Sequence, residues 1–348
     1  MDIVNPIVYH QAGWDEKRFQ PARYKAVAHP LHGGERVEAE LLRDPCMIRE
    51  GGWYYLVHTI YPFHHHTERD PEKPDDNSSP GIFLYKSQDL QCWQPVGWLV
   101  RSADLPEDCP YKHRFWAPEI TKINGKFYLT FTADNWIRKD YNRTGENGLY
   151  AFVGVADQVE GPYRHITEII GAGCDTSLFG DDDGKTYAYI PGGDIFVQEI
   201  DLSGLERDSV TLVGEKQRIV TASNADIGLP WNFRWLEGPW MMKEKGRYYL
   251  FFAGIHHPGD RAEMVHPGPP GTGFEYWAGV AYSDTPMGPF RKDERGRIVF
   301  GGHLTTFDGP DCRPWYAFRG ERPDPQTEGL LNIRPVIFEA DGRIEADD

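Results

Sequence analysis

The sequence repeats one short aromatic segment five times, and this repetition constrains the fold more strongly than any other feature of the chain. Each copy begins at a turn containing glycine or aspartate and continues into β-forming residues around a central tyrosine. The tyrosines lie 74, 59, 61 and 68 positions apart, so the copies occupy nearly all of the 348 residues. The copies are EGGWYYLVHT (50–59), NGKFYLTFTA (124–133), DDGKTYAYIP (182–191), EKGRYYLFFAG (244–254) and DCRPWYAFRG (311–320).

Each copy reads as a β-hairpin, and a single hairpin cannot bury both of its faces. Radial packing of several small sheets solves this problem, so the pattern predicts an all-β, five-bladed β-propeller that forms a single domain over residues 1–348. Outer strands recur as well, since VADQVEGPY (155–163) and YSDTPMGPF (282–290) share a pattern. We expect residues 1–40 to contribute to ring closure. A β-sandwich with chance similarities is the alternative.

Composition agrees with many short strands and limits the kinds of partner. Glycine (37 residues), proline (27) and aromatic residues (14%) are abundant, whereas long runs at helical spacing are missing. The net charge of -16 argues against a nucleic-acid partner, because phosphate binding requires a basic surface. A neutral or cationic ligand suits this charge better. The sequence does not indicate an oligomeric state.

The cellular environment is inferred from the cysteines and from the hydropathy pattern. No run of 18 apolar residues predicts a membrane span, and the start MDIVNPIVYH lacks the layout of a signal peptide. We therefore expect a soluble, cytoplasmic protein without a membrane partner, or a secreted one if a leader has been removed. Five cysteines without CxxC spacing favour reduced thiols. They are Cys46, Cys92, Cys109, Cys174 and Cys312.

One polar residue interrupts the apolar segment nine to thirteen positions before each central tyrosine. The innermost strands of a propeller line its channel, so these side chains are expected to converge near the axis. Gathering carboxylates where water is scarce costs several kcal/mol unless each is paired or protonated. Glycoside hydrolysis needs two carboxyl groups of different pKa, and so explains such a cluster. The five residues are Asp44, Glu119, Asp175, Glu237 and His303.

Four motifs in order along the chain resemble those of glycoside hydrolase family 43, the five-bladed propeller hydrolases. They are RDP (43–45), FWAPEI (115–120), DTSLFGDDDGK (175–185) and EGPWMMKEKGRYYLFF (237–252), and the resemblance runs from about residue 41 to 338. It implies an inverting hydrolase of terminal glycosidic bonds in plant-type oligosaccharides. An α-L-arabinofuranoside or a β-xyloside is the expected substrate, and a galactoside is a further candidate.

The resemblance also implies roles for individual residues. Asp44 resembles the general base that activates water, Glu237 the general acid, and Asp175 the third carboxylate, which orients the acid and raises its pKa. His303, in GGH, is similar to a histidine that helps to hold a hydrated calcium or sodium ion on the axis, although the reaction is expected to require no cofactor. Arg334, in LNIRPVIF, is similar to an arginine that contacts the sugar or the acids. One departure is that threonine, not proline, follows Asp175.

Further residues are candidates for contact with the sugar. Glu119 is expected beside the other acids, and Trp116 either offers its face to a sugar ring or packs within a blade. Trp136, in ADNW, and one of three adjacent histidines are expected at the rim of the pocket, with solvent exposure as the alternative for the histidines. Neighbours in an extended chain point in opposite directions, so the three cannot all bind one metal ion. They are His64, His65 and His66.

Two rival functions remain open from the sequence. A phosphorylase or a retaining glycosidase on a related propeller is one; a phosphorylase would need basic residues for phosphate, and no Lys/Arg cluster stands beside the acids in the sequence. A non-catalytic carbohydrate-binding propeller is the other. Such a protein is expected to lack the base or the acid, whereas all three acids are present here.

Overall fold

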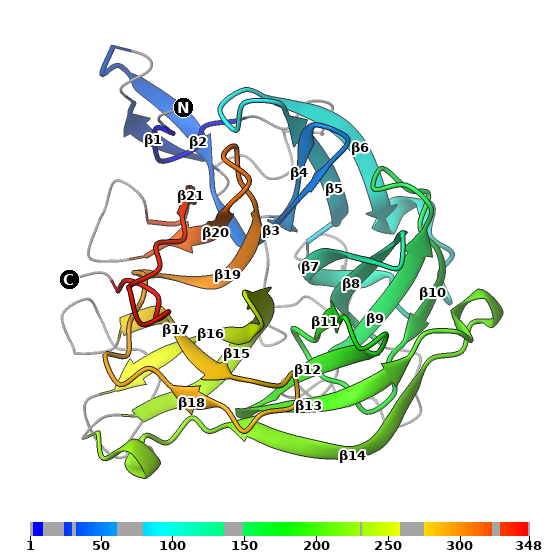
Figure 1. Ribbon diagram of the computed structural model, residues 1–348. Helices are drawn as coiled ribbons and strands as arrows, with labels where there is room; N and C mark the ends of the chain where they lie inside the picture. Colours follow the sequence, from blue (N-terminus) through cyan, green and yellow to red (C-terminus); the bar gives the residue numbers. More distant parts are fainter. Residues whose placement is uncertain are drawn as a thin grey trace.

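The computed structural model describes residues 3–9, 24–29, 33–60, 79–135, 149–229, 232–257, 275–321 and 328–346. It confirms the predicted all-β, five-bladed propeller, in which five small sheets are arranged radially around one axis (Figure 1). Four of these sheets have four antiparallel strands in chain order, and the fifth has three. None of the helices among the described residues is both long and apolar enough to cross a membrane.

The strands of each blade follow one another along the chain, from the axis outward. The first blade contains β3 (Leu42–Glu50), β4 (Trp53–Ile60), β5 (Gly81–Ser87) and β6 (Trp93–Arg101). The second contains β7 (His113–Ile123), β8 (Lys126–Asp134), β9 (Leu149–Ala156) and β10 (Arg164–Glu168). The third contains β11 (Ser177–Gly180), β12 (Thr186–Gly192), β13 (Asp194–Asp201) and β14 (Thr211–Val220).

The last two blades complete the ring. The fourth contains β15 (Asn232–Glu244), β16 (Arg247–His257), β17 (Glu275–Ser283) and β18 (Arg291–Lys292). The fifth contains β19 (Gly301–Asp308), β20 (Pro314–Gly320) and β21 (Leu331–Pro335). A separate hairpin is formed by β1 (Tyr24–Ala28) and β2 (Arg36–Glu40). Three short 3₁₀ turns are η6 (Ser102–Asp104), η7 (Leu205–Arg207) and η8 (Ala225–Ile227).

The inner hairpins form because their turns have the chemistry that tight turns require. Asn124 (φ 50°) and Gly125 (φ 81°) join β7 to β8, and Lys245 (φ 51°) and Gly246 (φ 80°) join β15 to β16. Positive φ at both central residues is the requirement of a type I′ turn, whose twist matches that of the flanking strands. The repeated aromatic residues of the hairpins then pack between neighbouring blades and form the core.

The amino-terminal segment lies along the outer edge of the fifth blade. The Ile7 N–H donates to the Leu331 carbonyl oxygen at 2.9 Å, and the Asn5 side chain both donates to the carbonyl oxygen of Ile333 and accepts from its N–H. Ile7 and Tyr9 are buried in a cluster that also contains side chains from the first and fifth blades. These contacts join the first blade to the last.

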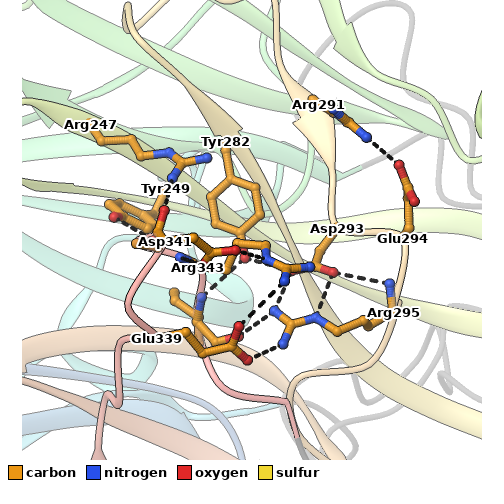
Figure 2. Close-up of polar contacts among 12 residues, drawn as sticks. Arg247, Tyr249, Tyr282, Arg291, Asp293, Glu294, Arg295, Glu339, Asp341 and Arg343 are labelled. Atoms are coloured by element: carbon orange, nitrogen blue, oxygen red, sulfur yellow. Dashed lines mark hydrogen bonds and ion pairs between the residues drawn. The ribbon is translucent and has the colours of Figure 1, made fainter.

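The carboxyl-terminal segment, residues 336–346, packs against side chains of β16 and β17 and against Arg295, which follows β18 in the fourth blade (Figure 2). Arg295 pairs with Asp293 and with Glu339 of the segment, and donates to the Ile344 carbonyl oxygen at 2.6 Å. Burial favours protonation of Asp293, but Arg295 and the Tyr282 hydroxyl hold the pKa of that carboxyl below its usual value. The segment therefore connects blade five to blade four at the periphery.

Candidate active site

The five polar residues of the inner segments lie at the centre of the ring. Asp44, Glu119, Glu237 and His303 are on β3, β7, β15 and β19, and Asp175 comes two positions before β11. These are the innermost strands of the five sheets (Figure 1). The propeller thus brings side chains from all five blades toward one axis.

Local backbone irregularity directs these side chains away from the regular ladder. The pairing of β3 with β4 shifts register between Arg43 and Cys46, and corresponding shifts flank Glu119, Glu237 and His303. A β-bulge of this kind redirects a side chain and tolerates a proline within an inner strand, which explains Pro45.

His303 is the hub of the cluster. Its ring is 2% exposed; Nδ1 lies 3.3 Å from Asp44 Oδ1 and 3.8 Å from Asp175 Oδ2, while Nε2 lies 3.3 Å from Glu119 Oε1. Burial opposes protonation of the ring, but the three carboxylates raise the pKa of His303 well above its usual value. The imidazole is therefore a buried cation shared by three acids.

Asp44 and Asp175 lie beside the same imidazolium, yet their pKa values shift in opposite directions. Burial favours the neutral form of Asp44, but His303, Arg43 and a 2.6 Å hydrogen bond from the Thr59 hydroxyl hold its pKa far below the usual range. Burial raises the pKa of Asp175 to about 7; His303 opposes the rise, and the charges of Glu237 and Asp44 add to it. One carboxyl is thus ionised at neutral pH, and the other is close to half protonated.

Asp175 has two further neighbours that the sequence analysis did not identify. The Cys174 thiol donates to Asp175 Oδ1 at 3.0 Å, and the Asp175 N–H donates to the Thr132 hydroxyl oxygen at 2.9 Å. All five cysteines are free thiols, in agreement with the expectation of reduced cysteines. Thr132 comes from β8 of the preceding blade, so only the packing of the ring brings it to the site.

Glu237 is held by two aromatic residues that were also missed. The Trp235 indole N–H donates to Oε2 at 2.6 Å, and the Tyr276 hydroxyl donates to Oε1 at 2.7 Å. Trp235 was identifiable in principle, because residues two apart on a strand share a face. Tyr276 on β17 carried no local signal, since it reaches Glu237 from two strands away in the blade.

Two glycines allow the fourth and fifth blades to interlock at the site. A Cβ on Gly238 would lie 2.9 Å from the His303 ring, and a Cβ on Gly302 would lie 1.6 Å from the Tyr276 ring. Each glycine thus stands next in sequence to one site residue and makes room for a site residue of the other blade. This explains the glycines of the EGP and GGH motifs physically.

The remaining sequence candidates have varied positions. Glu119 joins the cluster through His303 and is 1% exposed; burial raises its pKa, although His303 opposes the shift. Trp116 is half-buried on β7, with the Arg114 guanidinium 4.6 Å from its ring centre. Arg334 on β21 stacks on Tyr316 and Phe318 of the same blade. Trp136 and the histidines 64–66 lie outside the described residues.

The donor set around His303 does not fit a metal ion bound directly to this histidine. Both ring nitrogens face carboxylates, and a protonated imidazole has no lone pair to offer a metal. Within the described ranges, no group of three or more His, Cys, Asp and Glu side chains is arranged to hold a metal. Within this cluster, the positive charges of His303 and Arg43 act on Asp44 and lower its pKa.

Comparison with known sequences identifies the family. The family model described as "Glycosyl hydrolases family 43" matches residues 37–344. A xylosidase/arabinosidase of Butyrivibrio fibrisolvens is 28% identical over 79% of this chain and 46% of its own length. Xylosidase/arabinosidase 43B of Humicola insolens is 26% identical over 85% of this chain and 51% of its own. The chain therefore spans about half the length of these curated relatives.

Solved structures share the fold. A thermostable family-43 glycoside hydrolase superimposes with a TM-score of 0.64 at 22% identity, covering 88% of this chain and 93% of the other. A GH43 protein of Bacillus licheniformis also gives a TM-score of 0.64, at 21% identity, covering 94% of this chain and 56% of the other. At these identities the likeness establishes the propeller architecture.

Proposed function

Because the chain belongs to the glycosyl hydrolases of family 43, we propose that it is a glycosidase that cleaves terminal glycosidic bonds with inversion at the anomeric carbon. The observation that carries the proposal is the convergence of carboxyl groups from four blades around His303: Asp44 and Asp175 lie 3.3 and 3.8 Å from Nδ1, Glu119 lies 3.3 Å from Nε2, and Glu237 is close enough for its charge to act on Asp175. Paired carboxyl groups in one site are characteristic of acid–base catalysis on glycosides.

In the proposed mechanism, Asp44 is the general base. His303 and Thr59 hold its two oxygens, and the side chain remains 18% exposed, so it can still accept a proton from water. Its low pKa keeps it ionised across the working pH range, and a fixed anion also stabilises the oxocarbenium-like transition state. Positioned acid or base groups of this kind contribute typically about 10² to 10⁴ in rate.

Glu237 is the proposed general acid, which gives its proton to the departing oxygen on the other face of the sugar. Asp175 lies close enough to Glu237 for that charge to raise the pKa of Asp175. In the proposed mechanism Asp175 is the third carboxylate, which lies beside the acid and helps to orient it. These steps use only side chains of this chain.

The substrate class is the second part of the proposal. Both relatives described above are named xylosidase/arabinosidase, and we propose a β-xyloside or an α-L-arabinofuranoside of a short oligosaccharide, with a galactoside as the third candidate. The test is hydrolysis of the nitrophenyl glycosides of all three sugars by the purified protein, with NMR of the first anomer released. We expect turnover of a xyloside or arabinofuranoside and an inverted product.

Two results would contradict the proposal. Release of the retained anomer would exclude single displacement, and a sugar phosphate formed only in phosphate buffer would indicate a phosphorylase. The variant Asp44→Asn serves as the control for contaminating activity, because asparagine preserves the shape of the side chain but has no negative charge to accept a proton from water. Binding of the sugars without turnover by the wild-type protein would favour a carbohydrate-binding propeller.

A further inference from the structure

Trp235 and Tyr276 hold the two oxygens of the Glu237 carboxylate and take no part in the proton transfers described above. The indole N–H donates to Oε2 at 2.6 Å and the phenolic O–H donates to Oε1 at 2.7 Å. On the premise of the proposed function, we propose that both are positioning residues, which fix the plane of the general acid and so aim its proton at the leaving oxygen.

We call Trp235 and Tyr276 together the clamp. The general acid needs such a clamp because of the chemistry of a carboxyl group. The last torsion of a glutamate side chain has a broad energy profile, so an unrestrained carboxyl group samples many orientations. Each carboxylate oxygen has two lone-pair positions, and the two aromatic residues occupy one on each oxygen. The positions left over, one of which carries the acidic proton, therefore point in fixed directions. Fixed orientation of a reacting group is a large part of enzymatic rate enhancement.

The clamp is compatible with both protonation states of the acid. An indole N–H is a donor only, so the bond from Trp235 to Oε2 persists whether Glu237 is charged or neutral. A phenol can donate or accept, so Tyr276 adapts when the proton leaves. The raised pKa of Tyr276, which results from burial and from the charge of Glu237, keeps the phenol protonated.

Each clamp residue is itself held in place. The Arg234 guanidinium lies 4.8 Å from the centre of the Trp235 ring, within the range of a cation–π contact. The Tyr276 ring lies against the backbone of Gly302 in the next blade, where a Cβ would approach its ring carbon to 1.6 Å. A side chain at position 302 and the observed position of Tyr276 thus exclude each other.

The test uses substrates that differ in their need for an acid. An aryl glycoside with a dinitrophenolate leaving group departs without protonation, whereas a disaccharide of the same sugar requires it. We expect Tyr276→Phe and Trp235→Phe to lower kcat on the disaccharide by about 10- to 100-fold, part of the full contribution of a general acid. On the dinitrophenyl glycoside both variants should stay within about threefold of wild type. Gly302→Ala should reproduce the loss, because it displaces Tyr276.

Matched controls come from the same blade. Tyr249→Phe removes a phenol that donates to the Gly342 carbonyl oxygen, and Trp240→Phe removes an indole that donates to Thr306, and neither contacts Glu237. Both controls should retain wild-type activity on both substrates.

An equal loss on both substrates, or no loss on the disaccharide, would overturn the proposal. If Tyr276→Phe does not fold, Trp235→Phe decides alone, because it releases the other oxygen. Failure of the proposed function is a separate result, because the wild-type protein would then hydrolyse neither substrate.

Discussion

Three of the converging residues hold a backbone conformation that their side chains disfavour. Asp44, Asp175 and His303 have φ values of 52°, 58° and 47°, in the left-handed region. Such conformations cost about 1–3 kcal/mol each and persist only where the surroundings enforce them. Here the hydrogen bonds to Thr59 and Thr132 and the contacts around His303 supply that enforcement. The backbone is therefore strained at each of these three residues, and contacts with the rest of the propeller offset the cost.

This strain determines which substitution tests Asp44 cleanly. Asparagine tolerates the left-handed region better than most residues and still accepts the Thr59 hydrogen bond, so Asp44→Asn should fold. It removes the negative charge that accepts a proton from water, and we expect kcat to fall by about 10² to 10⁴. Steady-state kinetics and a thermal melt check the two halves of this prediction. Near-normal turnover in a folded Asp44→Asn protein would remove the residue from its role.

Asp175 makes a prediction about stability and pH. Its pKa is about 7 in the folded protein and 3.8 in the unfolded chain, so between these values the folded state retains a proton that the unfolded state has lost. Its contribution to the free energy of unfolding therefore falls as pH rises from 4 to 7, by at most about 1.4 kcal/mol per pH unit. Asp175→Asn removes this loss, so the variant should gain stability relative to wild type across that range.

Urea unfolding at pH 4, 5.5 and 7 measures the effect, and Asp181→Asn is its control. Asp181 lies in the turn between β11 and β12, where Lys243 and the Tyr248 hydroxyl, against the effect of burial, lower its pKa. Its carboxyl therefore titrates below pH 3.8 in the folded state and near 3.8 in the unfolded chain, so the difference in the free energy of unfolding between Asp181→Asn and wild type should change by less than about 0.5 kcal/mol from pH 4 to 7. An equally small change for Asp175→Asn would contradict the raised pKa.

At the scale of the element, the inner hairpins fold through turns that lie at the opposite ends of the strands from the site. Gly246 has a φ of 80° and open space around its missing Cβ, so Gly246→Ala probes backbone conformation alone. We expect a loss of about 1 kcal/mol in the free energy of unfolding and unchanged kcat. The substitution Lys245→Asn at the exposed neighbouring position, where φ is 51°, should instead raise the free energy of unfolding, because asparagine suits a type I′ turn better than lysine. Chemical denaturation of Gly246→Ala and Lys245→Asn checks both signs; equal stabilities would show that the turn does not limit the hairpin.

The strands and turns also show which features of the fold and the site local sequence patterns can predict. The aromatic hairpins, their turns and the polar residue on each inner segment were predicted because period-two alternation and turn chemistry are local properties. The partners of the acids depend on contacts between strands and blades that no local pattern encodes. Tyr276 reaches Glu237 from two strands away, and Thr132 reaches Asp175 from the preceding blade. Arg334, which the resemblance implied as a contact of the sugar or the acids, stacks on aromatic rings of its own blade, and its contact with a sugar stays a prediction.

At the scale of the whole molecule, the two terminal segments add contacts between blades: the amino-terminal segment joins the first blade to the last, and the carboxyl-terminal segment joins the fifth blade to the fourth. The segment 336–346 leaves the fifth blade and binds the fourth through Arg295, which follows β18 and contacts Glu339, the Ile344 carbonyl oxygen and the 2%-exposed Asp293 carboxylate (Figure 2). Contacts of this kind, here called the seam, help to hold the ring together, because each blade otherwise packs only against its two neighbours. The seam lies far from the acids in the fold, so its loss should affect stability without changing the chemistry.

Arg295→Met tests this seam, because methionine keeps much of the apolar length of the side chain and removes the charge. The substitution leaves Asp293 buried beside the Tyr282 hydroxyl without its cation, and breaking a buried pair in this way costs about 3–5 kcal/mol. The exposed pair of Arg291 and Glu294 provides the control, since Arg291→Met should cost less than about 1 kcal/mol. Adding Asp293→Asn to Arg295→Met removes the stranded charge and should restore part of the loss. Urea unfolding of the single and double variants, with kcat measured alongside, shows whether the Arg295 contacts stabilise the fold. If Arg295→Met is no more destabilising than Arg291→Met, the carboxyl-terminal segment does not help to hold the ring together.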